Sequence, residues 1–375
     1  MPIRELTPDD LEPLGRLHRV AFGRSDPVEA RPGTRGLAAE LDGRLAGALA
    51  ISDFHQFWGG STVPAGGIGG VAVDPWARGR GVASALLDAA LRDMRDRGQA
   101  LSVLYATVPA LYRSRGWERS GVFERLDFPL DRIPAGARAD TRPAVEGDLA
   151  ALHACYCDLA STVNGMLDRA APAFRAADVL ERAVVSVVPG HDGEVRGYLT
   201  AERDAEGLRV HDLVARDAAT QLGLLAQLRS WAGVLERVAV RVTDPATTGL
   251  LTDQAIRFTT TASAWLLRVV DLPAAVAARG WPAAEGLTTT VDLEVVDEHA
   301  PWHAGRRRLV VEDGRVRVEA GGGGDVRLHA RALGPWFSGM QDSSALRRAG
   351  LLDGDGRVLD RLVGAPGVPR LADFF

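Results

Sequence analysis

The spacing of apolar residues in the first third of the chain alternates between periods near 2 and near 3.6, which predicts strands interrupted by helices. The segment TPDD is a helix start, because Thr7 can cap the helix, Pro8 suits its first position and Asp10 falls in its first turn. The most regular amphipathic stretch, 83–97, stops at Gly98. Strands are predicted over 3–6, 36–41, 45–54, 66–74 and 101–106, a short helix over 109–115, and a closing pair of strands over 116–128.

A second unit begins near Asp140 and repeats the opening of the chain. The segment TRPAVEGDL follows the same order of strand, acidic turn and apolar helix as the opening IRELTPDDL. Strands are then predicted over 195–202, 208–215 and 237–243, with a helix over 218–232. This pattern predicts a degenerate second copy of the first fold.

From Asp271 onward, the pattern changes to a short helix, several strands and then helices. The run Gly321–Gly324 is expected to form a flexible hairpin loop. Strands are predicted over 287–295, 307–312, 315–319 and 325–330, and helices over 332–340, 343–349 and 353–363. We therefore predict a mixed α+β and α/β chain that divides into units 1–135, 136–270 and 271–375.

Composition and charge narrow the class of protein. The chain has 375 residues, 46% of them hydrophobic and 25% charged, as in ordinary globular proteins. A formal net charge of -5 gives no reason to expect the basic face that nucleic acid requires. The start of the chain has no signal-peptide pattern, and no long apolar window predicts a membrane span. We expect a cytoplasmic protein with no nucleic-acid or membrane partner.

The cysteines and histidines predict no metal site. Cys155 and Cys157 are separated by one residue, and no further cysteine or close histidine pair completes a zinc site. They fit two small apolar residues on a helix. His299 and His303 are four residues apart, but Pro301 breaks the helix that would align them. We expect no metal cofactor.

The stretch VAVDPWARGRGVASALL carries the main candidate chemistry. A strand runs into a glycine-containing turn that opens a helix, so free backbone N–H groups and the positive end of the helix dipole favour an anion such as a pyrophosphate. Gly79 and Gly81 let the backbone approach the phosphates, and Ala83 keeps the first turn thin. Arg78 and Arg80 can add charge-assisted hydrogen bonds.

Three of these residues, Arg78, Gly81 and Ala83, satisfy the pattern R-x-x-G-x-A, which resembles the signature of the GNAT superfamily of N-acetyltransferases. The resemblance implies acetyl-CoA as the co-substrate. It also implies that backbone groups around Val71 and Val73 bind the pantetheine arm and the thioester carbonyl, where a preorganised N–H stabilises the developing oxyanion. The predicted cofactor site comprises Val71, Ala72, Val73, Arg78, Gly79, Arg80, Gly81, Val82, Ala83 and Thr107.

A tyrosine in the segment ALYRSRGW is the candidate general acid. The segment resembles the superfamily element in which a tyrosine, here Tyr112, faces the sulfur of CoA. A phenol with a pKa near ~10 is protonated at neutral pH and can protonate the leaving thiolate. A tyrosine packed in the core is the alternative. Tyr105, on the preceding strand, is expected to be structural.

The layout of the whole chain is similar to the enhanced intracellular survival (Eis) family, bacterial acetyltransferases related to aminoglycoside and polyamine modifiers. This resemblance implies two tandem GNAT folds followed by a sterol carrier protein-like α/β domain. It implies that the free C-terminal carboxylate, here of Phe375, enters the first active site as the general base. Phe374 and Asp373 are then substrate-binding candidates. It also implies a homo-oligomer, with a hexamer as the suggested state.

The second unit departs from the GNAT pattern. Residues 214–223 contain no Gly-x-Gly or Gly-x-Ala turn at the phosphate position, so this unit is expected to bind no acetyl-CoA. The sequence predicts an acetyl-CoA-dependent N-acetyltransferase in which a primary amine of a small cationic substrate, such as an aminoglycoside or polyamine, attacks directly. Two alternatives stay open: a lipid- or small-molecule-binding protein that uses GNAT folds as scaffold, and a protein-lysine acetyltransferase.

Overall fold

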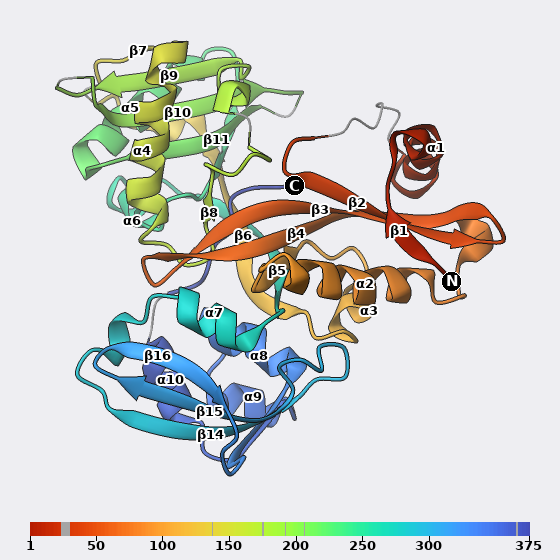
Figure 1. Cartoon of the computed structure of the whole chain (residues 1–375). Helices are drawn as coiled ribbons and strands as arrows, with labels where there is room; N and C mark the ends of the chain where they lie inside the picture. Colours follow the sequence, from red (N-terminus) through yellow and green to blue (C-terminus); the bar gives the residue numbers. More distant parts are fainter. Residues whose placement is uncertain (24–30, 137, 175, 192, 206, 365–366) are drawn as a thin grey trace.

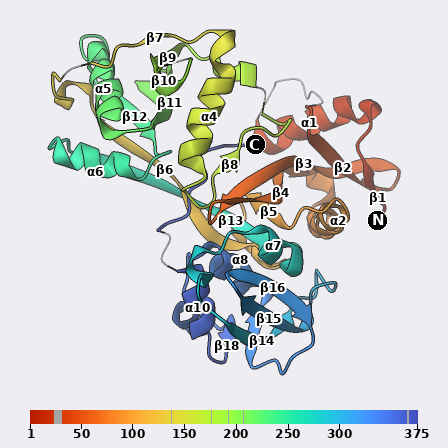
Figure 2. The same ribbon diagram turned by 60° about the vertical axis from the view of Figure 1, so that its left-hand side comes forward.

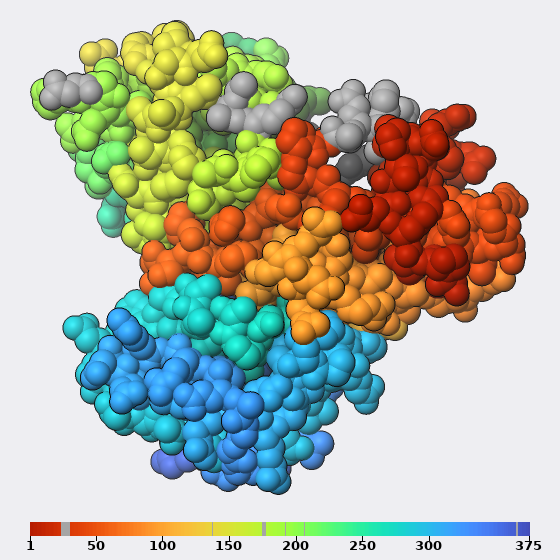
Figure 3. Space-filling model, viewed as in Figure 1, coloured from red at the N-terminus to blue at the C-terminus, as the bar shows by residue number. Residues whose placement is uncertain are grey.

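The computed structural model describes residues 1–23, 31–136, 138–174, 176–191, 193–205, 207–364 and 367–375. The ribbon forms three lobes: the start of the chain, a second lobe beside it, and a third lobe below the first (Figure 1). The space-filling view shows the same three lobes in contact with one another (Figure 3). No helix in the described ranges is both long and apolar enough to cross a membrane.

The first lobe is a sheet covered by helices on both faces. Helix α2 packs its buried residues Leu86, Leu87 and Met94 on one face, while α1 packs Leu14 and Leu17 on the other. Neighbouring strand residues point to opposite faces, so a strand in this position needs apolar residues on both sides. The elements are β1 Ile3–Glu5, α1 Leu11–Phe22, β2 Thr34–Leu41, β3 Arg44–Trp58, β4 Ser61–Val73, α2 Val82–Asp96, β5 Leu101–Leu104, α3 Pro109–Arg113 and β6 Glu118–Pro129.

The second lobe repeats the opening of the first at the level of single side chains. The Arg4 guanidinium donates to both carboxylate oxygens of Asp10, at 2.6 and 2.8 Å. Arg142 makes the same pair of bonds to Asp148, at 2.7 Å each. The elements are β7 Arg142–Pro143, α4 Leu149–Ala160, β8 Leu167–Asp168, β9 Val184–Pro189, β10 Val195–Arg203, β11 Leu208–Ala215, α5 Ala218–Leu228, β12 Arg237–Arg241, α6 Ala246–Asp253 and β13 Thr259–Val269.

One long sheet runs through both lobes. Its strand order is β1-β2-β3-β4-β5-β13-β6-β12-β11-β10-β9-β7, with β8 paired to β3 off this path. The predicted closing pair of strands over 116–128 is wrong, because this segment is the single strand β6. Its neighbour on the first-lobe side is β13, which pairs antiparallel with both β5 and β6. A local pattern cannot reveal a partner as distant in sequence as Ala264 is from Val122, with which it pairs.

The third lobe has a five-stranded sheet of order β16-β15-β14-β17-β18 covered by helices. The run Gly321–Gly324 is not a hairpin loop, because β17 pairs parallel with β14 and the run crosses over β15 and β14. The elements are α7 Leu272–Ala278, β14 Thr289–Val296, β15 Gly305–Glu312, β16 Arg315–Ala320, β17 Val326–His329, α8 Ala330–Ser338, α9 Ser343–Arg348, β18 Leu352–Asp353 and α10 Arg357–Val363.

After α10 the chain returns to the first lobe. Arg370 forms a parallel bridge with Val122 of β6, and Leu371 donates its N–H to the carbonyl of Val122 at 3.1 Å. The Tyr105 hydroxyl, on the segment just after β5, donates to the carbonyls of Leu371 and Asp373 at 3.0 and 3.1 Å. The C-terminus therefore lies between the first and second lobes, beside β3 (Figure 2).

Candidate active site

Strands β4 and β5 separate at the centre of the first lobe. They pair in parallel only from Ala65 to Gly67, whereas β4 continues to Val73. Gly70 has a φ of +60°, and the register of β4 against β3 shifts in this stretch, as at a bulge. Among the described strands, none pairs with the β5-facing edge of β4 beyond Gly67, so its backbone groups there are available to a ligand.

The glycine turn follows β4 and opens α2, as predicted. Gly79 and Gly81 have φ values of +76° and +78°, which glycine adopts without strain. Gly81 is the N-cap of α2 and has no side chain to cap the helix. Within the described residues, the amides of Val82, Ala83 and Ser84 have no hydrogen-bond acceptor. No atom lies within 4 Å of a Cβ built at Gly79 or Gly81, so the turn faces open space.

The other residues predicted for the cofactor flank this turn. Val71 and Val73 are half-buried on β4, and Ala72 between them is buried. Arg78 and Arg80 are exposed. Thr107 is exposed in the segment after β5. The predicted set therefore lies along one continuous path from β4 through the turn, with Thr107 on the far side of the opening.

Tyr112 lies on α3, and its side chain is 7% exposed. It packs in one cluster with Leu104 of β5, Val71 and Val73 of β4 and several residues of α2. Burial raises the pKa of its phenol above the usual value of 10.0, so the group is protonated at neutral pH. Tyr112 therefore carries its proton at neutral pH and packs beside the separating strands.

Phe375 lies against the opposite side of β4. Its ring centroid is 5.0 Å from that of Phe54 on β3. Its carbonyl oxygen is 3.0 Å, and its carboxyl carbon 3.4 Å, from the position that a Cβ at Gly69 would take. A Cβ at Gly67 would lie 2.7 Å from the Phe375 ring. The two glycines of β4 thus make room for the last residue of the chain.

A cavity of about 710 Å³ lies between the first two lobes and includes this end of the chain. Its wall combines residues of α1, β3 and β4 with residues of α4, β10 and β11. The aromatic side chains in the wall are Phe54, Tyr156, Phe174, Tyr198, Phe374 and Phe375, and the charged ones are Arg31, Arg169, Asp178, Arg182, Asp212, Arg241 and Asp373. Both of these lobes and the tail therefore contribute to one cavity.

Comparison with known proteins agrees with this geometry. Residues 2–120 match the acetyltransferase (GNAT) domain family, and residues 272–371 match the sterol carrier protein domain family. An uncharacterized N-acetyltransferase of Streptomyces coelicolor is 30% identical, covering 90% of this chain and 89% of that protein. The N-acetyltransferase Eis of Mycobacterium bovis is 28% identical, covering 90% and 84%. A GCN5-related N-acetyltransferase structure from Kribbella flavida is 29% identical over the whole of both chains, with a TM-score of 0.86.

The chain belongs to the Eis-like family of GNAT N-acetyltransferases. The predicted fold class is confirmed, with two tandem GNAT folds and a sterol carrier protein-like domain. The protein is thus an N-acetyltransferase, from a superfamily that uses acetyl-CoA. The boundaries predicted between its units stay a prediction.

Asp373 and Phe374, the two substrate-binding candidates of this Eis-like protein, differ in burial. Asp373 is buried, and its carboxylate accepts a hydrogen bond from Arg169 at 3.0 Å. Arg169 also donates two bonds to Asp212, at 3.0 and 2.8 Å, so it bridges the two carboxylates. Phe374 is 59% exposed, with its ring between those of Tyr105 and Phe123. Asp373 therefore anchors the tail, whereas Phe374 presents a ring to solvent.

The second GNAT lobe supplies cavity residues that sequence reasoning missed. His211 accepts a hydrogen bond at Nδ1 from Arg241, at 2.9 Å. Burial and the neighbouring charges of Arg241 and Arg182 lower the pKa of His211, so it is neutral at pH 7. The sequence of this lobe lacks a cofactor turn and so predicted only a degenerate copy of the first fold. The alternating apolar residues of 208–215 predicted a strand that contains His211. They did not predict that this side chain faces the cavity.

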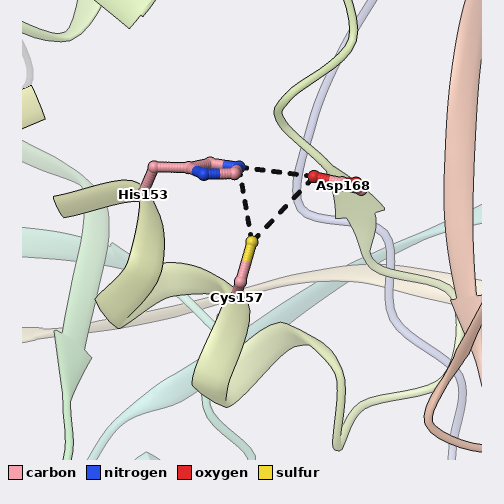
Figure 4. Close-up of side chains that lie close together, drawn as sticks. All are labelled: His153, Cys157 and Asp168. Atoms are coloured by element: carbon pink, nitrogen blue, oxygen red, sulfur yellow. Dashed lines mark hydrogen bonds and ion pairs between the residues drawn. The ribbon is translucent and has the colours of Figure 1, made fainter. Parts of the chain in front are cut away.

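A second missed group lies at the edge of the cavity. His153 Nε2 is 3.3 Å from Asp168 Oδ1 and 3.3 Å from Cys157 Sγ (Figure 4). The spacing of Cys155 and Cys157 predicted no metal site, and a mixed cluster of one histidine, one cysteine and one aspartate has no such spacing signal in the sequence. By contrast, His299 and His303 bind separate carboxylates: His299 contacts Asp88 at 3.0 Å, and His303 contacts Asp297 at 2.8 Å.

Proposed function

We propose that this enzyme transfers the acetyl group of acetyl-CoA to a primary amine of a small molecule bound in the cavity between the two GNAT lobes. One observation carries the proposal: the tail ends with its carboxyl group against Gly69, at the separation of β4 and β5. The terminal carboxylate of Phe375 therefore lies on the side of β4 that faces the cavity. The glycine turn proposed to bind the pyrophosphate follows the same strand.

The residues present fit acetyl-CoA. Unpaired amides at the start of α2 and the open space at Gly79 and Gly81 suit a pyrophosphate, with Arg78 and Arg80 beside them. When bound, acetyl-CoA supplies an acetyl thioester. The unpaired edge of β4 near Val71 would hydrogen-bond the thioester carbonyl and stabilise negative charge on its oxygen.

The Phe375 carboxylate is the proposed base. An α-carboxyl group is ionised at neutral pH, so it can accept a proton from the nitrogen of the substrate amine as that nitrogen attacks the thioester, directly or through a water. Its position is enforced by Tyr105, which holds the tail carbonyls, and by the ion pair of Asp373 with Arg169. Tyr112, whose phenol is protonated at neutral pH, is the proposed acid that protonates the departing CoA sulfur.

The charged residues in the cavity wall indicate how many amines the acceptor molecule carries. Aminoglycosides and polyamines are the acceptors that the family resemblance suggests, and the Phe375 carboxylate would attract their ammonium groups. However, the wall also holds Arg31, Arg169, Arg182 and Arg241. Asp212 and Asp373 are already paired with Arg169. We therefore propose an acceptor with one or two amines near the base, rather than a polycation with many.

The test is a thiol-release assay of acetyl-CoA turnover over aminoglycosides, polyamines, monoamines and lysine peptides. Because the chain contains no lysine, acetyl-lysine detected by mass spectrometry would come only from an added peptide. We expect monoamines or diamines to be the best acceptors. Turnover restricted to lysine peptides would instead support a protein acetyltransferase. The predicted homo-oligomer, a hexamer by resemblance, is checked by light scattering on the same sample.

Two variants test the acid and the base. Tyr112→Phe and a single glycine added after Phe375 should each lower turnover by about 100-fold, because general acid–base catalysis contributes roughly 10²–10⁴-fold. Acetyl-CoA affinity, measured by calorimetry, should stay within about a factor of two. A single glycine added at the N-terminus is the control for the extension. Unchanged rates in both variants would disprove these two roles.

A further inference from the structure

Among the described residues, one group of three potential metal ligands lies outside the proposed acetyl-transfer machinery: His153, Cys157 and Asp168. His153 and Cys157 are one turn apart on α4, so their side chains share a face of that helix. Asp168 belongs to β8, which pairs with β3 of the first lobe. Figure 4 shows the three side chains converging from the helix and the strand.

The spacing of the three ligand atoms matches one face of a zinc tetrahedron. His153 Nε2 lies 3.3 Å from Asp168 Oδ1 and 3.3 Å from Cys157 Sγ, and the sulfur is 3.9 Å from the same oxygen. With Zn–N and Zn–O bonds of about 2.0–2.1 Å and a Zn–S bond of about 2.3 Å, tetrahedral ligand atoms lie roughly 3.3–3.6 Å apart. A metal ion would therefore need movements of only a few tenths of an ångström.

A nucleophilic triad does not explain this arrangement. In such a triad, one imidazole nitrogen contacts the nucleophile while the other binds the orienting carboxylate. Here Nε2 of His153 is close to both the Cys157 sulfur and the Asp168 oxygen. Convergence of three donor atoms on one point is what a metal site needs.

The surroundings hold the carboxylate ligand in place. Asp168 Oδ1 accepts the N–H of Ala170 at 3.0 Å, which fixes the carboxylate on the metal-facing side. The Tyr156 hydroxyl donates to the carbonyl of Leu167 at 2.8 Å and so links α4 to β8. The side chains of His153 and Asp168 are 37% and 25% exposed, which leaves a path for an ion to enter.

We propose that His153, Cys157 and Asp168 form a zinc-binding site with three protein ligands and one open position. A nitrogen, thiolate and carboxylate donor set suits zinc, and three protein ligands leave room for a water or another ligand. Binding displaces the thiol proton of Cys157 to solvent as the sulfur–zinc bond forms. Because His153 also lines the cavity, the ion becomes part of the wall of the acceptor cavity and ties α4 to β8.

Cobalt titration of the full-length chain, after treatment with a chelator, tests the proposal directly. A thiolate ligand gives cobalt a charge-transfer band in the near ultraviolet, so we expect this band to saturate at one ion per chain. Zinc should then displace the cobalt and abolish the band. Cys157→Ser should remove the band, and Asp168→Asn should weaken binding by about 10- to 100-fold.

The matched control is Cys155→Ala, which removes the neighbouring thiol, buried on the same helix, and leaves Cys157 in place. This variant should keep the band. The proposal is overturned if the wild-type chain shows no band, if Cys157→Ser retains it, or if Cys155→Ala, checked for native circular dichroism, loses it. Anomalous scattering from zinc-soaked crystals identifies the ligands without any variant. Since these readouts measure metal binding alone, they are independent of acetyl transfer.

Discussion

At the scale of single residues, the end of the chain and β4 are fitted to one another. Gly67 and Gly69 present no side chains where Phe375 lies. Leu371 and Ala372 are buried, and Asp373 is tied to Arg169, so the tail is held before its last residue is reached. A group held to within a fraction of an ångström is what acid–base catalysis requires, because a misplacement of about 1 Å can cost ~100-fold in rate.

Gly67→Ala should therefore impair catalysis by displacing Phe375. The new Cβ would lie 2.7 Å from the Phe375 ring and 2.6 Å from the Phe54 ring. We expect turnover to fall by about 10- to 100-fold and the free energy of unfolding to fall by about 1–3 kcal/mol, with acetyl-CoA affinity unchanged. Steady-state kinetics, calorimetry and urea unfolding measure the three quantities.

Gly249→Ala is the control for this substitution. Gly249 lies on α6, and no atom lies within 4 Å of its added Cβ. Alanine there should leave turnover unchanged and stabilise the helix by up to about 1 kcal/mol. If Gly67→Ala kept full turnover, the position of the last residue would not matter to catalysis.

At the scale of elements, a buried charge network joins β13 to the third lobe. The Arg268 guanidinium on β13 donates to Asp297, whose other oxygen accepts the N–H groups of His299 and Ala300. His303 also donates from Nε2 to Asp297, at 2.8 Å, and accepts from the third-lobe backbone at Nδ1. The side chains of Arg268 and Asp297 are both fully buried. Such a pair is costly to break, because removing one partner leaves the other charge uncompensated.

Asp297→Asn should lower the free energy of unfolding by about 3–5 kcal/mol at neutral pH. Burial alone would raise the pKa of Asp297, but the hydrogen bond from His303 and the charge of Arg268 outweigh it, so the pKa is held below its usual 3.8. The stabilisation is thus fully present above pH 3.8 and is lost as pH falls through the lower folded-state pKa.

Urea unfolding of the wild type and the Asn variant, at neutral pH and at several values below 3.8, measures this difference. The difference in free energy of unfolding between the two proteins should be constant down to pH 3.8 and should become smaller below it. Glu298→Gln, at the exposed neighbouring position, should change stability by no more than about 0.5 kcal/mol. A gap that widened on acidification would contradict the assigned ionisation of Asp297.

Elements with local signals were predictable from the sequence, and those defined by distant partners were not. The apolar periodicity predicted α2 to within one residue at each end, and the glycines predicted the turn before it. Both signals are local in the sequence. It could not place β13 between β5 and β6, nor the crossover of Gly321–Gly324, because both depend on long-range pairing. The resemblance suggested the role of Phe375, whereas the cavity residues from the second lobe had no local signal.

At the scale of the whole molecule, the first lobe is not a closed unit. Among the described strands, β5 and β6 pair not with each other but with β13, which follows them by more than a hundred residues. One hydrophobic cluster also runs from Trp58 and Val63 of the first lobe to Leu293 and Leu309 of the third. The units are thus similar to known domains in sequence, but the first two share one sheet, and the first and third share one hydrophobic cluster.

Fragment 1–135 should therefore fail to fold and to bind acetyl-CoA. Without β13, the facing edges of β5 and β6 lose their partners, and exposed strand edges favour aggregation. Fragment 272–375 is the contrasting cut, because the five-stranded sheet β14–β18 lies entirely within it. It should keep its far-ultraviolet circular dichroism and a dispersed proton–nitrogen spectrum, but at a lower free energy of unfolding, because the cut removes Arg268 and the first-lobe side of the shared cluster. Native acetyl-CoA affinity in fragment 1–135, measured by calorimetry, would show that β13 is dispensable and that the first lobe can close its own sheet.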